Sequence, residues 1–131
     1  MPPALPPSAL AHWLPLALAG AVGSVARAAV TDLAVRIAGP SFPWGTALVN
    51  VLGALAFGAI VAAGRSRGAF PPGLDRVLLV GLLGGFTTFS SYAFQAVELW
   101  QSGRHAAAAA YVIGSNALAL LAVWAGLRLA A

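Results

Sequence analysis

The side chains that could do chemistry in this chain are neutral hydrogen-bonding groups set into strongly apolar stretches. Thr46 and Asn50 lie four residues apart in one such stretch, so they share one face of a helix. Tyr111 and Ser115 repeat that spacing in another stretch, and a dense polar run, "GGFTTFSSY", occupies residues 84–92. Polar side chains in hydrocarbon are costly unless they pair or line a wet path. These groups therefore predict either helix contacts or a pathway for a small solute.

The donors in these stretches suit an anion better than a cation. The Asn50 amide offers two N–H donors, and the ring edges of Phe89 and Tyr92, three residues apart on one face, are electropositive. Arg27 adds a positive charge deep in the first apolar stretch. The chain has few carboxylates for acid–base chemistry: Asp32, Asp75 and Glu98. We predict no catalytic residues and no enzyme activity.

Composition places these groups in a membrane protein. Of 131 residues, 60% are hydrophobic and 8% are charged, whereas a soluble domain of this length needs a more charged surface. The mean hydropathy is +0.89. Arginines without lysine give a pI near 11.3, but they are scattered rather than clustered, which argues against nucleic-acid binding. Without cysteine, the chain can form neither disulfides nor thiolate metal sites.

Four apolar segments are each long enough to cross about 30 Å of hydrocarbon. They cover approximately residues 12–37, 44–64, 76–101 and 105–129, and proline and glycine mark the connections. We predict a single all-α transmembrane domain over residues 1–131, embedded in the lipid bilayer. No signal-peptide cleavage is expected, because the leader carries no basic residue and the apolar character continues past it.

The distribution of arginines barely favours one orientation. One side of the membrane would hold Arg65, Arg67, Arg76 and Arg128, and the other Arg36 and Arg104. The positive-inside rule then weakly favours cytoplasmic termini. Because so small an excess cannot force one orientation, a chain that inserts both ways and pairs head to tail with itself is possible.

The same polar and small residues also allow a simpler interpretation, which is helix packing. Small residues four apart let helix backbones approach closely, as in the pairs Gly20/Ser24, Ala54/Gly58 and Gly81/Gly85. Within "GGFTTFSSY", Gly84 and Gly85 weaken a helix, while Thr87 and Thr88 can stabilise freed backbone groups. We therefore expect a third helix that is broken at mid-membrane, with outward-turned carbonyls able to bind a hard monovalent cation.

Four motifs carry a resemblance to the small fluoride channels of the Fluc (CrcB) family, and the likeness covers nearly all of the chain. These are "GAVGSVAR" ending at Arg27, "WGTALVNVLGALAFG" in the second segment, "GLLGGFTTFSS" in the third and "YVIGS" in the fourth. The third is close to the most distinctive stretch of that family.

The resemblance implies an antiparallel, dual-topology homodimer in the cell (inner) membrane, with two fluoride pathways and a structural sodium ion at its centre. Its function would be passive fluoride export that relieves fluoride toxicity. The residues carried over to the fluoride pathway are Thr46, Asn50, Phe89, Ser90, Ser91, Tyr92, Tyr111 and Ser115, with Arg27 at an aqueous vestibule. By the same resemblance, backbone carbonyls of Gly84 and Thr87 would hold the sodium ion.

This sequence departs from the family pattern at three positions. Tyr92 stands where a second phenylalanine is usual, Gln95 where a glutamate is common, and Ala119 where a serine is often found. Two other function classes stay open. A small multidrug-type proton-coupled transporter also has four spans but needs an embedded carboxylate, whereas Asp32 lies near the end of its segment. A non-transporting assembly protein would use the polar residues for packing alone.

Overall fold

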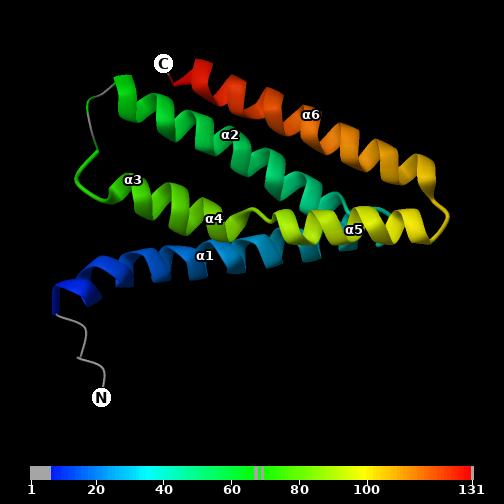
Figure 1. The fold of residues 1–131 in the computed structure, drawn as a ribbon, viewed down its shortest axis with the longest axis horizontal. Coiled ribbons are helices and arrows are strands. Elements are labelled where there is room, and N and C mark those ends of the chain that lie inside the picture. The colour runs from blue at the N-terminus through cyan, green and yellow to red at the C-terminus, as the bar shows by residue number, and fades with distance from the viewer. Residues whose placement is uncertain (1–6, 67, 69, 131) are drawn as a thin grey trace.

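The computed structural model describes residues 7–66, 68 and 70–130, so the first six leader residues and Arg67 lie outside the described residues. The described chain is helical throughout, with short connections (Figure 1). Its elements are α1 (Pro7–Ala38), α2 (Trp44–Ser66), α3 (Leu74–Arg76), the π-helical turn η1 (Val77–Leu82), α4 (Leu83–Phe86), α5 (Phe89–Gln101) and α6 (His105–Leu129).

Four helices are long and apolar enough to cross a membrane, which confirms the predicted all-helical membrane architecture. They cover Leu10–Ala38, Trp44–Ser66, Leu74–Gln101 and His105–Leu129. The Leu74–Gln101 helix, called the third span below, comprises α3, η1, α4 and α5. The chain is therefore a multi-pass membrane protein by the length and composition of its helices.

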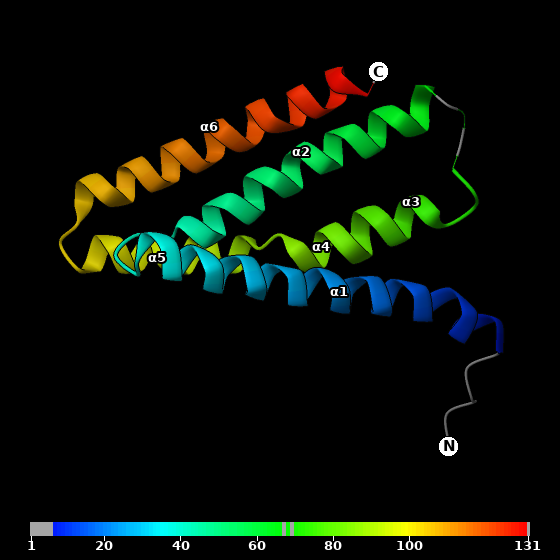
Figure 2. The ribbon, with the colours of Figure 1, turned by 180° about the vertical axis from the view of Figure 1, so that it is seen from behind.

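The helices form two packed pairs (Figures 1 and 2). α2 runs alongside α6, and α1 runs along η1 and α4. Both ends of the described chain lie at the same end of the bundle as the start of α3, as four consecutive crossings require. The arginine-richer side of the sequence thus lies at one end of the molecule.

Glycines allow both helix pairs to approach closely. A Cβ on Gly23 of α1 would overlap the Leu82 carbonyl, and one on Gly85 would overlap the Gly20 carbonyl. Between α2 and α6, a Cβ on Gly58 would overlap the Val123 carbonyl, and Gly126 faces Leu55 in the same way. Packing by small residues, the simpler of the two interpretations, is thus confirmed at Gly58 and Gly85.

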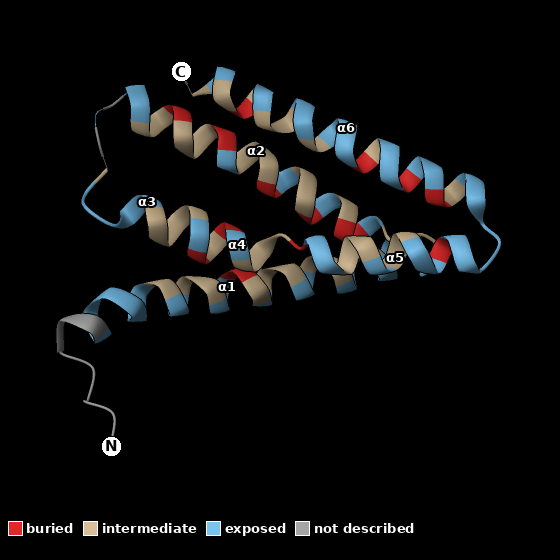
Figure 3. Cartoon of the chain, viewed as in Figure 1, coloured by how far each residue is buried: buried red, intermediate tan, exposed pale blue. Residues whose placement is uncertain are grey.

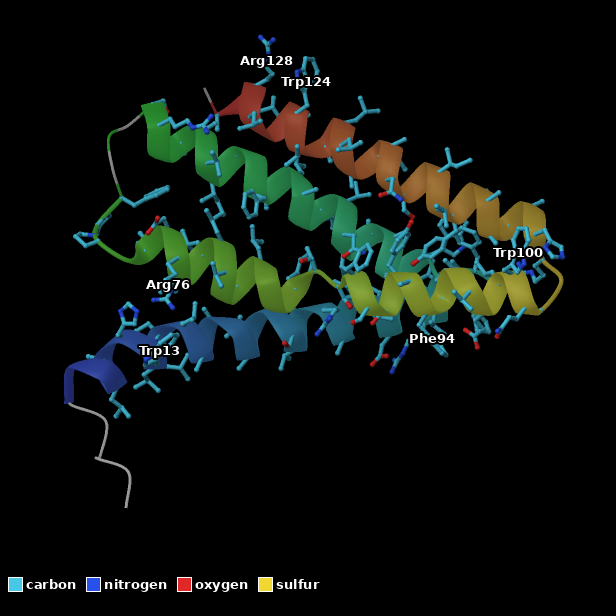
Figure 4. The ribbon with its side chains drawn as sticks, in the orientation of Figure 1. Trp13, Arg76, Phe94, Trp100, Trp124 and Arg128 are labelled. Carbon is cyan, nitrogen blue, oxygen red and sulfur yellow. The ribbon has the colours of Figure 1, made fainter. Side chains whose placement is uncertain are left out.

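Little of the single chain is buried, and several tryptophans lie toward its two ends. Figure 3 shows buried residues only as isolated patches along the four spans. Figure 4 shows Trp13 beside Arg76 and Trp124 beside Arg128 at one end, and Trp100 at the other. The guanidinium carbon of Arg76 lies 4.7 Å from the Trp13 ring centroid. Amphipathic rings of this kind sit at membrane–water interfaces.

The third span is broken near its middle, as predicted, and the break falls at its two adjacent threonines. α4 ends at Phe86, and α5 begins at Phe89. Thr87 and Thr88 between them have extended backbones, with φ/ψ of −86°/159° and −151°/117°. Gly84 and Gly85 stay helical, so the chain leaves the helix at the threonines and not at the glycines. Gly85 instead serves the close approach of α1.

Candidate functional site

A side chain from another helix holds the break in the third span. Asn50 of α2 donates from Nδ2 to the Thr88 carbonyl at 3.0 Å and accepts from the Thr88 N–H at Oδ1 at 2.8 Å. Gly53, one turn further along α2, leaves room for the Thr87 methyl group, which a Cβ there would overlap. The Asn50 amide thus satisfies backbone groups that hydrocarbon could not, and keeps one N–H for another partner.

Hydroxyl groups cap the start of the next helix, α5. Thr88 caps α5 by accepting the Ser91 N–H at Oγ1 at 3.2 Å, and it donates to the Ser91 hydroxyl at 3.1 Å. The Ser90 hydroxyl lies 3.4 Å from the same oxygen. An N-cap of this kind stabilises a helix start by about 1 kcal/mol. The positive end of the α5 dipole therefore lies at the break.

The break also releases the two carbonyl groups that the sequence analysis assigned to a cation. In an unbroken helix, the Gly84 carbonyl would accept from the Thr88 N–H, but that N–H bonds to Asn50. The Thr87 carbonyl would accept from the Ser91 N–H, which bonds to the Thr88 hydroxyl instead. Arg27 Nη1 lies 3.5 Å from the Thr87 oxygen. Since a carbonyl oxygen has two lone pairs, this contact leaves one available.

A cavity of about 230 Å³ lies beside the break. Its lining residues are uncharged, most of them carry a hydroxyl or amide group, and two aromatic rings from the first turn of α5 add apolar surface. The lining residues are Asn50, Thr87, Thr88, Phe89, Tyr92, Ser115, Asn116 and Ala119. The N-terminal end of α5, a free N–H of Asn50 and several hydroxyls therefore meet in one place. Such a lining can hold a small anion that has lost part of its hydration shell.

A larger cavity of about 430 Å³ lies at the end of the bundle where α1 ends and α2 begins. Thr46 and Gln95 belong to its lining. Tyr111 stands between the two cavities: its ring centroid lies 5.5 Å from that of Phe42, which lines the larger cavity, and 5.2 Å from that of Tyr92. Tyr92 is in turn 5.7 Å from Phe89. These four rings form a continuous row from the bundle end to the break.

The predicted pathway residues are therefore divided between several places. Asn50, Phe89, Tyr92 and Ser115 meet at the smaller cavity, and Thr46 lines the larger one. Ser90 and Ser91 form part of the hydroxyl cluster at the start of α5. Arg27 lines neither cavity and instead contacts the break from the side of α1.

The three positions that depart from the family pattern all lie in this region. Tyr111 donates its hydroxyl hydrogen to Gln95 Oε1 at 2.9 Å. Tyr92 accepts from Asn116 Nδ2 at 2.6 Å, and Ala119 lines the same cavity as both. Asn116 was not among the predicted pathway residues, and its signal in the sequence was an amide within an apolar helix. Thr88 was expected to stabilise freed backbone groups, and its hydroxyl accepts the Ser91 N–H at the start of α5.

Among the described residues, no group of three or more histidine, aspartate or glutamate side chains could hold a metal ion. Any cation near the break would therefore depend on oxygen ligands from the backbone or from hydroxyl and amide groups. Carbonyl oxygens suit hard cations such as sodium rather than transition metals.

Comparison with known proteins identifies the family. A family model described as CrcB-like protein, Camphor Resistance (CrcB), matches residues 14–127. The chain belongs to the CrcB family. Two relatives are named fluoride-specific ion channel FluC. The one from Paracoccus denitrificans (strain Pd 1222) is 49% identical over 115 residues, covering 88% of this chain and 90% of the relative. The one from Nitratidesulfovibrio vulgaris (strain DSM 19637 / Miyazaki F) is 46% identical over 112 residues, covering 86% and 90%.

Membership of the CrcB family gives no support to the proton-coupled transporter interpretation. A third relative, from Chelativorans sp. (strain BNC1), is 40% identical over 119 residues and carries the same channel name. Asp32, the carboxylate nearest to the centre of a span in the sequence, is exposed toward the end of α1. It lines neither the larger nor the smaller cavity.

Proposed function

We propose that this protein is a channel that lets fluoride leave the cell passively across the inner membrane and so relieves fluoride toxicity. The observation that carries the proposal is the cavity beside the break, where neutral donors from three spans meet in a chain of the CrcB family. No titratable group lines that cavity apart from Tyr92, so the lining suits passive conduction rather than proton-coupled exchange.

The proposed pathway runs from the cavity at the bundle end to the cavity beside the break. Thr46 lies in the first, and Tyr111 separates it from the second, where Asn50, Phe89, Tyr92 and Ser115 can contact the ion. Ser90 and Ser91 keep the start of α5 in place, and Arg27 holds positive charge beside the break. Fluoride would exchange its water for amide and hydroxyl donors along this route.

Fluoride efflux from liposomes that contain the purified protein tests this function. Passive efflux should follow the fluoride gradient, should not require a proton gradient, and should far exceed chloride efflux measured beside it. A proton gradient that is strictly required would support a transporter, and no efflux of either ion would support an assembly protein.

We further propose that two oppositely oriented copies form the channel. In the single chain, Asn116 and Ser90 are exposed, and the Phe89 side chain is 78% exposed beside them. An exposed amide and hydroxyl within spans are costly in lipid, so a second copy that covers this face would turn an open groove into an enclosed path. The small arginine bias between the two ends allows both orientations.

Reporter fusions at the C-terminus test the dual topology, because they read the side of the membrane on which the chain ends. Both orientations should occur in the same cells. Adding two or three lysines to the leader should bias insertion and lower fluoride resistance, since oppositely oriented partners become scarce. A single orientation for every molecule of the unmodified protein would contradict the antiparallel dimer.

A structural sodium ion between the two breaks is the third part of the proposal. The Gly84 and Thr87 carbonyls have lost their helical donors, and two copies related by a two-fold axis would supply four oxygens. The ion would bind carbonyl oxygens that the break deprives of their helical donors. It would be held at the dimer centre and would not itself be transported.

Exhaustive exchange into sodium-free buffer tests the sodium site. Fluoride efflux and dimer stability should both fall, and adding sodium back should restore them. Unchanged activity and unchanged dimer stability without sodium would instead mean that the break is held by Asn50 and the hydroxyl groups alone.

A further inference from the structure

Asn116 of α6 makes a hydrogen bond that the proposed pathway does not use. Its Nδ2 atom lies 2.6 Å from the Tyr92 hydroxyl oxygen and 2.7 Å from the Val112 carbonyl oxygen. Both Asn116 and Tyr92 line the cavity beside the break. An amide side chain in an apolar helix is costly. The two short hydrogen bonds of Asn116 therefore need an explanation.

The Val112 carbonyl determines the direction of the bond to Tyr92. A carbonyl oxygen can only accept, so the Asn116 atom that faces it must be the nitrogen. The same nitrogen faces the Tyr92 hydroxyl, and an amide N–H₂ group can only donate. The Tyr92 oxygen therefore accepts this bond, and its own hydrogen must point elsewhere.

The Tyr92 hydroxyl hydrogen is left for a partner in the cavity. A phenol has one hydrogen to donate, and within the described residues the bond from Asn116 is the one the structure gives to this hydroxyl. The neighbouring Tyr111 differs, since its hydrogen is already donated to Gln95. A phenol that accepts one hydrogen bond also becomes a stronger donor, because bonds in a chain polarise one another.

We propose that Asn116 is a positioning residue that turns the Tyr92 hydroxyl into a hydrogen-bond donor for fluoride in the cavity beside the break. This inference rests on the proposed fluoride channel and adds a donor to it that a ring edge alone would not supply. An amide that was absent, or that presented its oxygen, would let the hydroxyl hydrogen turn away from the ion.

A purely structural alternative is that the bond only ties α5 to α6. Both interpretations predict that removing either side chain lowers activity and that the two losses overlap. They differ in the effect of fluoride on Tyr92. If the Tyr92 hydroxyl donates to fluoride, its hydrogen bonding must change when the ion binds. If the bond only connects α5 and α6, the hydrogen bonding of Tyr92 stays the same. The test therefore needs a flux measurement and a direct observation of the hydroxyl.

The flux measurement compares fluoride efflux from liposomes for the unmodified protein, Asn116→Leu, Tyr92→Phe and the double variant. Each single change should lower efflux about fivefold, the effect of one neutral hydrogen bond. The double variant should lose no more than Tyr92→Phe alone. Leu118→Ala, which removes an exposed side chain on the opposite side of α6 from Asn116, serves as the matched control and should keep normal efflux.

The direct observation is the Raman Fermi doublet of tyrosine, whose intensity ratio reports whether the hydroxyl donates or accepts. The chain has two tyrosines, so the difference between the unmodified protein and Tyr92→Phe isolates Tyr92. Fluoride should shift this ratio toward donation, and Asn116→Ala should weaken the shift. If Asn116→Leu does not fold, the shift in the unmodified protein still decides the question.

The outcomes separate this inference from the proposed function. An unmodified protein without fluoride efflux overturns the channel itself. Normal efflux in Asn116→Leu, or a tyrosine doublet that fluoride leaves unchanged while the protein conducts, overturns the role of Asn116 and leaves the channel in place.

Discussion

The two halves of the third span use small and polar residues for opposite purposes. In η1 and α4, Gly81 and Gly85 bring the backbone against α1, and a Cβ on Gly85 would overlap the Gly20 carbonyl. Beyond the break, Thr88 and Ser91 instead make hydrogen bonds within the chain, and Phe89 is left 78% exposed. The first half is built for close contact between helices, and the second half leaves donors and a ring available.

This contrast shows that small residues in a membrane span have no single meaning. A glycine that faces a backbone carbonyl is there because nothing larger fits, whereas a hydroxyl that replaces a helical hydrogen bond lets the backbone leave the helix. The stretch "GGFTTFSSY" contains both uses within nine residues. Which use applies depends on the partner that each residue meets, and the predictions below test the two halves separately.

The largest effect is expected from Gly23→Ala in α1. Its new Cβ would overlap the Leu82 carbonyl of η1, so α1 would have to move away from the third span. We expect destabilisation of about 3 kcal/mol, at the upper end of typical overpacking costs. Thermal unfolding in detergent, followed by circular dichroism, measures it.

Gly20→Ala is the matched control for this prediction, one turn earlier on α1. Its Cβ would meet the nearest atom, the Gly81 carbonyl oxygen, at an ordinary contact distance of 3.7 Å. It should leave stability unchanged or raise it, because alanine favours a helix by about 1 kcal/mol over glycine. Equal melting temperatures for both variants would show that α1 can accommodate a Cβ at residue 23 without moving away from the third span.

The second largest effect is expected from Asn50→Asp, which acts on the break and the half of the third span beyond it. The carboxylate could still accept the Thr88 N–H, but it could not donate to the Thr88 carbonyl, and its charge would repel fluoride. Loss of this partly buried bond, together with the charge repulsion, supports a fall in efflux of about 100-fold. Size-exclusion chromatography should still show an assembled protein. Normal efflux would mean that Asn50 serves packing only.

Much of the architecture could be predicted from the sequence because hydrophobicity and length determine it. Four apolar segments and a polar stretch in the third were sufficient to predict four helices and a break. The position of the break was not predictable from glycine content, since Gly85 is held helical against Gly20 of another helix. Asn50, 38 positions before Thr88 in the chain, bonds to it only after folding.

For the candidate site, too, some features could be predicted from the sequence and others could not. Residues within a distinctive motif, such as Phe89 and Ser91, could be selected as candidate site residues from the sequence. The role of Asn116 could not, because it depends on the distance of its amide from Tyr92, which lies on another helix. The same is true of the contact between Arg27 and the Thr87 carbonyl. Contacts between spans are set by helix rotation, which a sequence pattern specifies only loosely.

The third prediction concerns the exposed ring at the start of α5. Phe89→Ile keeps an apolar side chain but removes the electropositive ring edge, and it should lower fluoride efflux about tenfold, within the range of aromatic edge interactions. Stability should stay nearly unchanged, because this side chain is 78% exposed in the single chain. The loss should exceed that of Tyr92→Phe, measured in the same liposomes. Equal tolerance of both changes would mean that the rings only fill space.

The smallest effect is expected from Thr88→Val. This change tests whether the break is held in place by the Thr88 hydroxyl cap or by the two hydrogen bonds between Asn50 and the Thr88 backbone. Valine has the shape of threonine but cannot accept the Ser91 N–H, so α5 would lose its cap at a cost of about 1 kcal/mol. The backbone of residue 88 would keep both bonds to Asn50, so the break should persist and efflux should fall only about fivefold. Thr88→Ser, which restores the hydroxyl, should recover most of the loss. A loss as large as that of Asn50→Asp would show instead that the cap, rather than the amide from α2, determines where the third span opens.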